Sequence, residues 1–392
     1  MKLQKTPYYS YKIGTLPKGC QMCIKGEKLV LFITGLCPRS CYFCPISDKK
    51  YKKDVTYADE WPTTNINEII KEAKLINAKG AGLTGGDPLC KLQRTLLYIK
   101  ALKKQFGKEF HIHLYTSLDL VTEDNLNKLH KAGLDEIRFH LDFDNNRLWA
   151  KLTLPLAFEW DIGIEIPVIP SKEAEIKKII QIINNINKNS ESKIKFLNLN
   201  ELEIADNKVS KLAKLGYKTK DQFSYAIKGS NELALKLLKF VENKEIKLNV
   251  HYCTATLKDK VQLANRIKRR AKNTAKPFDI INQDGTLTRG VIYIEELKPS
   301  FKYNSMLKEI KPAKKSKIIK KLNTIKNQLK KDFKIKNELI DIDKNKLRIL
   351  TSVKEIRKIN KDKKLLEKKT LFPAIVTEYP THDQLELDIK FL

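Results

Sequence analysis

Short apolar runs alternate with amphipathic stretches from residue 28 to about residue 203, and this alternation predicts consecutive βα units. Strands are expected at residues 29–33, 80–83, 110–115, 136–141, 162–168 and 194–199. Helices are expected between them at 65–78, 92–105, 123–132 and 173–187, where apolar side chains recur at helical spacing. Six units favour an α/β fold of the partial (β/α)6, TIM-like kind, with the carboxyl ends of the strands at one mouth.

The pattern changes in the last third of the chain. A helix at 231–241 leads into the apolar run 246–250, which is either a seventh strand or the start of an extension. Beyond it we expect a basic helix (258–273), a hairpin around Asp284-Gly285 (278–295), a lysine-rich helix (313–331), a second hairpin (339–350), a helix (353–369) and two strands (374–377 and 385–391). The expected organisation is an N-terminal segment with a CxxC (1–27), a partial barrel (28–255) and a smaller basic α+β domain (256–392).

Three of the seven cysteines, Cys37, Cys41 and Cys44, stand in a CxxxCxxC loop directly after the first expected strand. A four-iron cluster has four iron corners, so three thiolates from one loop leave one corner free. Zinc normally takes a fourth protein ligand, often from paired CxxC motifs, and the uneven spacing therefore argues against a structural zinc site. The loop predicts a [4Fe–4S] cluster with one open iron at the mouth of the barrel.

A second motif, Thr84-Gly85-Gly86-Asp87-Pro88, ends the second expected strand. Together with the cysteine loop, and with Phe43 just before its third cysteine, this motif resembles the radical S-adenosylmethionine (SAM) superfamily over residues 28 to 205. Many members carry glutamate where this chain has Asp87, and the shorter acid keeps the charge. The resemblance implies a radical SAM barrel whose cluster cleaves SAM to a 5′-deoxyadenosyl radical.

The resemblance also implies roles for single residues. Phe43 would lie beside the cofactor, Gly85 and Gly86 would bring backbone close to the methionine part of SAM, and Asp87 would support its ammonium group. Polar residues at later strand ends are candidates for ribose and adenine contacts, each equally well explained as a polar cap or a substrate contact: Thr116, His140, Asp142, Glu165, Asn198 and Asn200. No catalytic acid or base is identified.

A second metal site is one of three interpretations of the remaining cysteines. Cys20 and Cys23 form a CxxC before the barrel, and His251 and Cys253 follow its last apolar run. If the last strand returned beside the first, these four could bind zinc, or the cysteines could hold an auxiliary iron–sulfur cluster. The third interpretation is that the CxxC is a free or redox-active pair and Cys253 a buried thiol.

The formal charge of +30 favours a polyanionic partner. Lysine greatly outnumbers arginine, as an A/T-rich genome would give without any binding role, yet Arg266, Arg269 and Arg270 cluster within five residues. The region 258–336 is therefore expected to contact RNA, such as tRNA, although a solvated lysine-rich face explains it too. No apolar run reaches the length of a membrane span and no signal peptide is recognisable, so we expect a cytoplasmic protein without membrane contact.

These features lead to three hypotheses about function. The first is a radical SAM enzyme that modifies RNA, binding its target through the basic region and taking electrons from a low-potential donor. The second is a protein-modifying or glycyl-radical-activating enzyme, because the barrel is also similar to that of pyruvate formate-lyase activating enzyme. The third is a non-catalytic iron–sulfur or zinc protein that binds RNA.

Overall fold

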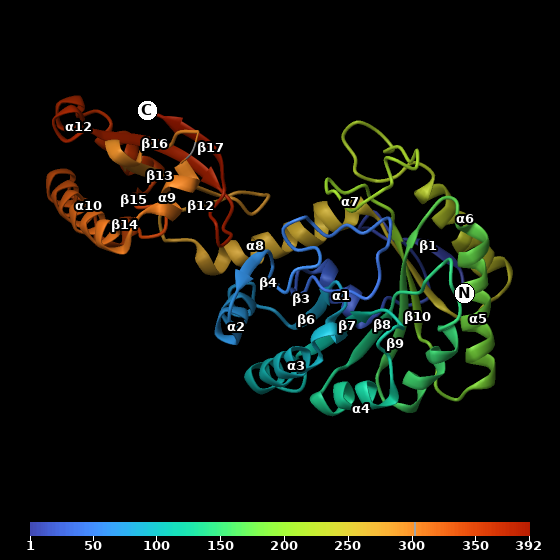
Figure 1. Cartoon of the computed structure of the whole chain (residues 1–392). Coiled ribbons are helices and arrows are strands. Elements are labelled where there is room, and N and C mark those ends of the chain that lie inside the picture. Colours follow the sequence, from blue (N-terminus) through green and yellow to red (C-terminus); the bar gives the residue numbers. More distant parts are fainter. Residues whose placement is uncertain (302) are drawn as a thin grey trace. The chain divides into compact units, whose positions relative to one another are not determined.

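The computed structural model describes residues 1–301 and 303–392, which form two compact units, Met1–Arg266 and Ile267–Leu392 (Figure 1). The division falls within the helix α8 (Ala264–Thr274), later in the chain than the boundary expected after residue 255. Each unit has its own sheet and its own apolar core.

Parallel strands form the centre of the first unit's eleven-stranded sheet. In the order in which they lie side by side they are β11 (Asn249–Cys253), β10 (Phe196–Glu201), β9 (Asp161–Val168), β8 (Glu136–Phe139), β7 (His111–Thr116), β6 (Gly80–Gly85) and β3 (Lys28–Thr34). Short antiparallel strands extend both ends, with β2 (Tyr11–Ile13) and β1 (Leu3–Lys5) beyond β11, and β4 (Thr56–Ala58) and β5 (Trp61–Thr63) beyond β3. The sheet stays open, so the predicted partial barrel is confirmed, and the run before His251 leads into a seventh parallel strand.

Amphipathic helices connect the parallel strands and cover the outer face of the sheet (Figure 1). They are α2 (Ile66–Leu75), α3 (Leu92–Phe106), α4 (Glu123–Ala132), α5 (Glu173–Asn189) and α6 (Ser230–Asn243), with the short helical segments η1 (Pro88–Lys91) and η2 (Trp149–Ala157). Local sequence sets their ends: Thr122 caps the start of α4, and Gly133 ends it with φ +97°. Past β11, α7 (Ala255–Leu257), the π-helical η3 (Lys258–Leu263) and α8 form the predicted basic helix.

The helix α1 (Lys18–Ile24) lies against the inner face of the sheet, among the inward-pointing side chains. The approach is close at Gly19, where a Cβ would stand 2.5 Å from Arg138 Nη2, 2.8 Å from His113 Nδ1 and 3.0 Å from Glu136 Oε1. The Gly19 N–H also donates to Glu136 Oε2 at 3.3 Å. The CxxC on α1 therefore belongs to the interior of the barrel rather than to a separate segment.

The second unit is an antiparallel sheet with helices packed on it. Its strands follow the order β14 (Ile340–Asp343), β15 (Arg348–Thr351), β13 (Leu287–Ile294), β16 (Leu371–Glu378) and β17 (Glu386–Phe391), and β12 (Ile280–Ile281) pairs with β13. Its helices are α9 (Tyr303–Glu309), α10 (Pro312–Phe333), α11 (Val353–Ile359) and α12 (Lys363–Lys369), with the turns η4 (Glu295–Leu297) and η5 (Asn337–Leu339). Both predicted hairpins are present. The single helix expected at 353–369 is wrong, because Asp362 caps a new helix there.

Candidate active site: a three-cysteine loop at the mouth of a partial barrel

A cavity of about 820 Å³ opens at the carboxyl ends of the parallel strands. Residues from six successive strand ends and loops line it, among them Cys37, Cys41, Phe43, Cys44, Gly85, Gly86, Thr116, Ser117, His140, Glu165 and Asn200. The structure thus brings together nearly all of the residues that the sequence singled out for cluster and cofactor. Ser117, which directly follows β7, also lines the cavity and was not predicted from the sequence.

The cysteine loop follows β3, and hydrogen bonds to other parts of the barrel fix its course. Arg39, inside the loop, donates to the His140 carbonyl at 3.0 Å and forms an ion pair with Asp142, also at 3.0 Å. Phe43 packs against His140 and Phe143, with ring centroids 5.8 and 6.4 Å apart. Sequence reasoning missed Arg39, whose signal was a lone cation within an otherwise uncharged loop.

The two glycines that end β6 allow a close backbone approach to the start of the cysteine loop. Gly86 N–H donates to the Thr34 carbonyl at 2.8 Å, and a Cβ at Gly86 would stand 2.7 Å from the Leu36 carbonyl carbon and closer still to its oxygen. Gly85 has φ +139°, where side chains are strained. Glycine is therefore needed at both positions because the chain's own backbone just before Cys37 leaves no space for a Cβ. Both glycines also face the cavity.

Asp87 lies behind the cavity wall rather than in it, with 1% of its surface exposed. Its carboxylate accepts four hydrogen bonds, from Leu89 N–H, the Thr116 hydroxyl, and the N–H and hydroxyl of Ser117, at 2.8 to 3.0 Å. These donors fill the lone-pair positions of both oxygens. The prediction that Asp87 supports the ammonium group of the cofactor is therefore wrong, and its role is to tie the glycine turn to the end of β7.

Glu165 faces the cavity as a partly buried carboxylate. Arg138 Nη1 donates to Oε2 at 2.7 Å, and the amides of Asn198 and Asn200 donate at 2.9 Å to Oε2 and Oε1. Although burial alone would raise it, Arg138 and the amides hold the pKa of Glu165 below its usual value. Oε1 thus keeps a lone pair for a hydroxyl group in the cavity.

His140 closes the neighbouring part of the wall. Burial lowers the pKa of its imidazole to about 4, and its Nδ1 lies 3.2 Å from the Glu165 carbonyl oxygen. The ring is therefore neutral near pH 7, and Nδ1 carries the proton that it donates to this carbonyl. The free nitrogen, Nε2, is then an acceptor.

Comparisons with known proteins agree with this geometry. The family model of the Radical SAM superfamily matches residues 31–159. A protein of Methanocaldococcus jannaschii, provisionally named a glycyl-radical enzyme activating enzyme, is 45% identical over 297 residues, which are 74% of this chain and 76% of that protein. The chain belongs to the radical SAM superfamily.

Two more distant likenesses are to other enzymes. The biotin synthase of Pseudoalteromonas translucida is 28% identical over 114 residues, or 28% of this chain and 31% of that protein. The structure of coproporphyrinogen III oxidase (HemN) from Escherichia coli, a radical SAM enzyme, has a TM-score of 0.33 and 11% identity over 58% of this chain and 56% of its own.

As a radical SAM enzyme, the chain uses a [4Fe–4S] cluster and SAM. The cavity fits these groups, because three free thiols from one loop reach its wall beside Gly85 and Gly86. No helix in residues 1–301 or 303–392 is long and apolar enough to cross a membrane.

The four residues expected at a second metal site come from α1 and β11. Cys20 Sγ accepts a hydrogen bond from Asn198 Nδ2 at 3.2 Å, and Cys253 Sγ one from Gln262 at 3.7 Å. His251 is 1% exposed, and within the described residues neither ring nitrogen has a hydrogen-bond partner. β11 pairs with β2 and β10 rather than with β3, so the sheet does not close, but Ile24 at the end of α1 packs in one apolar cluster with Cys253.

A tetrahedral zinc site would hold four such ligand atoms about 3.8 Å apart, given Zn–S distances near 2.3 Å. In the described part of the chain, the one group with three or more ligand atoms all within 4.8 Å of one another is His111, Glu136 and Asp161. The structure therefore does not gather Cys20, Cys23, His251 and Cys253 around one point, and a metal on them stays a prediction.

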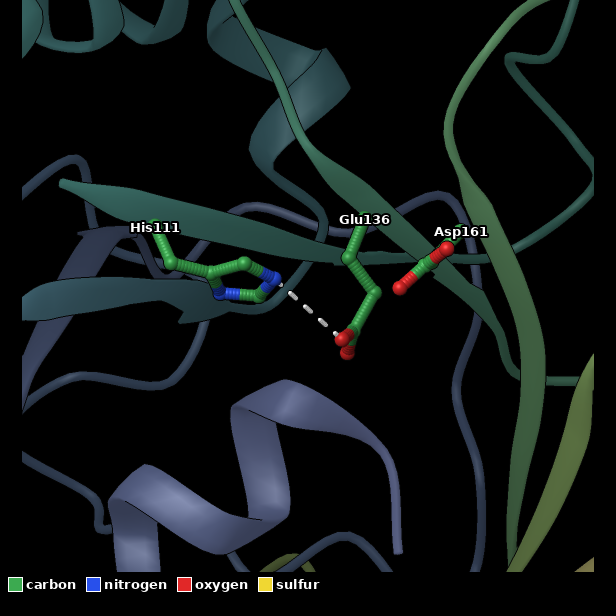
Figure 2. A group of neighbouring side chains, drawn as sticks. All are labelled: His111, Glu136 and Asp161. Carbon is green, nitrogen blue, oxygen red and sulfur yellow. Dashed lines mark ion pairs between the residues drawn. The ribbon is translucent and has the colours of Figure 1, made fainter. Parts of the chain in front are cut away.

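The group of His111, Glu136 and Asp161 lies at the opposite end of the strands, where β7, β8 and β9 begin (Figure 2). Lys28 Nζ is 2.6 Å from His111 Nδ1, and His111 Nε2 faces Glu136 at 3.5 Å. Burial lowers the pKa of the Lys28 ammonium group to about 7, and within the described residues His111 Nε2 has no hydrogen-bond partner. Arg138, which also pairs with Glu136, continues the buried network up to Glu165.

Proposed function

We propose that Cys37, Cys41 and Cys44 bind three irons of the [4Fe–4S] cluster and leave the fourth iron to SAM within the cavity. The common cavity wall supports this assignment. Bound there, the cluster would supply the electron for reductive cleavage of SAM, and with it the radical chemistry that removes a hydrogen atom from the substrate. The residues of the chain position these groups and exclude water.

The polar residues of the wall suit SAM by their protonation states. Glu165 offers an ionised oxygen to a ribose hydroxyl, and neutral His140 offers Nε2 to a hydrogen-bond donor without adding charge. Gly85 and Gly86 line the cavity beside the cysteine loop, where the methionine part of SAM would lie. Phe43 and Thr116 complete the wall between these ends.

For the substrate, we propose a partner protein on which this enzyme forms a glycyl radical. One observation carries this choice, namely the 45% identity, over three quarters of the chain, to the M. jannaschii protein with that provisional name. The expectation of an RNA substrate finds no support in the comparisons. The proposal places the target glycine of the partner in the cavity, beside the site of hydrogen abstraction.

The test uses an anaerobic lysate of cells from which this gene has been deleted. Reconstituted enzyme, SAM and a low-potential reductant are added, and electron paramagnetic resonance is recorded. We expect a stable organic radical that is coupled to one α-hydrogen, and cleavage of one polypeptide at a glycine when oxygen is admitted. Without either change, and with SAM still cleaved, the glycyl-radical proposal fails while the radical SAM assignment stands.

RNA modification remains the second candidate because of one surface feature. The helix α10 exposes Lys314, Lys317, Lys320 and Lys331 opposite its buried apolar side, and residues 312–331 contain no acidic residue. Such a face suits a phosphate backbone. If nucleosides of tRNA from the deletion strain lack a modification that the wild type carries, this candidate replaces the first.

A further inference from the structure

A second cavity, of about 500 Å³, adjoins the cysteine loop. Cys41 and Tyr51 line both this cavity and the large one, whereas Tyr42, Lys208 and Lys211 line only the second. Its walls come from the cysteine loop, from the segment before β4, and from the long connection between β10 and α6. The cluster loop thus has one side on the SAM cavity and another on this opening.

Hydrogen bonds hold the long connection against the cluster loop. The Asn207 side chain donates to the carbonyls of Cys44 and Ile46 at 3.1 and 2.9 Å, and Lys211 N–H donates to the Tyr42 carbonyl at 2.7 Å. These bonds fix the backbone from which the lysines of the rim project. These hydrogen bonds therefore hold Lys208 and Lys211 beside the cluster loop.

The rim carries excess positive charge. Lys52, Lys208 and Lys211 are exposed, and within residues 1–301 and 303–392 no acidic side chain forms an ion pair with them. Asp48 is the acidic residue of the lining, and one of its oxygens accepts the Lys208 N–H at 3.0 Å. Three ammonium groups against one carboxylate at a concave opening attract an acidic surface.

We propose that this opening and its lysines are the docking surface for an acidic, low-potential electron-transfer protein, which reduces the cluster past Cys41. The inference rests on the proposed binding of the cluster by Cys37, Cys41 and Cys44. One electron leaves the reduced centre of the donor, which becomes oxidised, and enters the cluster; no bond is formed or broken in this step. SAM and substrate fill the large cavity, so the electron must arrive from another side, and electron-transfer partners need only a small, charged contact.

The test compares two double charge reversals. Lys208→Glu with Lys211→Glu changes the rim, and Lys239→Glu with Lys244→Glu makes the same change of charge at exposed lysines at the end of α6. Cluster reduction in each reconstituted protein is followed by anaerobic stopped-flow absorbance, with either a reduced two-cluster ferredoxin or reduced methyl viologen as donor. The milder pair Lys208→Gln and Lys211→Gln serves if the first variant fails to retain its cluster.

With ferredoxin at low salt, we expect the rim variant to be reduced at least tenfold more slowly than the wild type and the control variant at an unchanged rate. High salt should slow the wild type and remove the difference. With methyl viologen as donor, the cluster of neither variant should be reduced more slowly than that of the wild type. Equal ferredoxin rates in the rim and control variants, slowing with methyl viologen as well, or loss of tRNA binding alone would each overturn the proposal. If neither donor reduced the cluster of the wild type, that result would instead contradict the proposed function.

Discussion

Gly86 gives the sharpest test of how the glycine turn supports the cysteine loop. In Gly86→Ala the new methyl group would stand 2.7 Å from the Leu36 carbonyl carbon and 2.9 Å from the Gly35 oxygen, whereas ordinary contacts begin near 3.4 Å. The Leu36 carbonyl oxygen lies nearer still, so the loop backbone must retreat by roughly 1 Å, since none of these contacts is a flexible side chain. Overpacking of this kind costs about 1–3 kcal/mol, and the displacement falls on the residue before Cys37.

The assay measures iron and sulfide content after anaerobic reconstitution, together with the urea midpoint of unfolding. We expect Gly86→Ala to lose most of its cluster while its stability falls by about 1–3 kcal/mol. Gly216→Ala is the matched control, because its methyl group would meet nothing within 4 Å although φ is +81°. It should lose comparable stability, about 1–2 kcal/mol, and keep its iron. A Gly86→Ala protein with a full cluster would refute the reasoning.

Two further predictions concern other parts of the chain. If the barrel interior holds a second metal, replacing Cys20 and Cys23 with alanine lowers iron or zinc content below that of Cys90→Ala, and unchanged content of both metals dismisses the site. In the second unit, Arg348→Ala removes the ion pairs that Arg348 forms with Asp343, Glu378 and Glu386 and leaves buried Glu378 with Arg289 alone, at a cost of about 3–5 kcal/mol near pH 7. Burial already raises the pKa of Glu378 against the pull of Arg348, and losing Arg348 raises it further, so the destabilisation grows as pH rises above the ordinary carboxyl pKa. Urea midpoints at pH 5 and pH 8 test this, and an equal loss at both would contradict it.

The barrel and its mouth could be predicted because periodicity and motifs act locally. Strands of βα units are buried on both faces and read as apolar runs, and parallel strands bring their carboxyl ends to one edge whatever the details of packing. The order of these runs along the chain is therefore enough to predict that Cys37, Gly85 and Glu165 share one site. A one-residue difference in register would not have changed that expectation.

The rest of the site depends on contacts between distant segments. Asp87 has the charge of a ligand contact, yet four donors from two elements turn it into a structural carboxylate, and no local signal reports those donors. Likewise, the position of α1 inside the barrel depends on Gly19 meeting Glu136, more than a hundred residues later. Such side-chain partnerships are set by the fold rather than by spacing along the chain.

The central claim is that the loop of Cys37, Cys41 and Cys44 carries a cluster that cleaves SAM. Anaerobically reconstituted protein is reduced with dithionite in the presence of SAM, and 5′-deoxyadenosine and methionine are quantified. We predict equal amounts of both products from the wild type and from Cys90→Ala, and none from Cys41→Ala. A wild type that holds its cluster and yet forms no 5′-deoxyadenosine, or a Cys41→Ala protein that forms it undiminished, would contradict the claim.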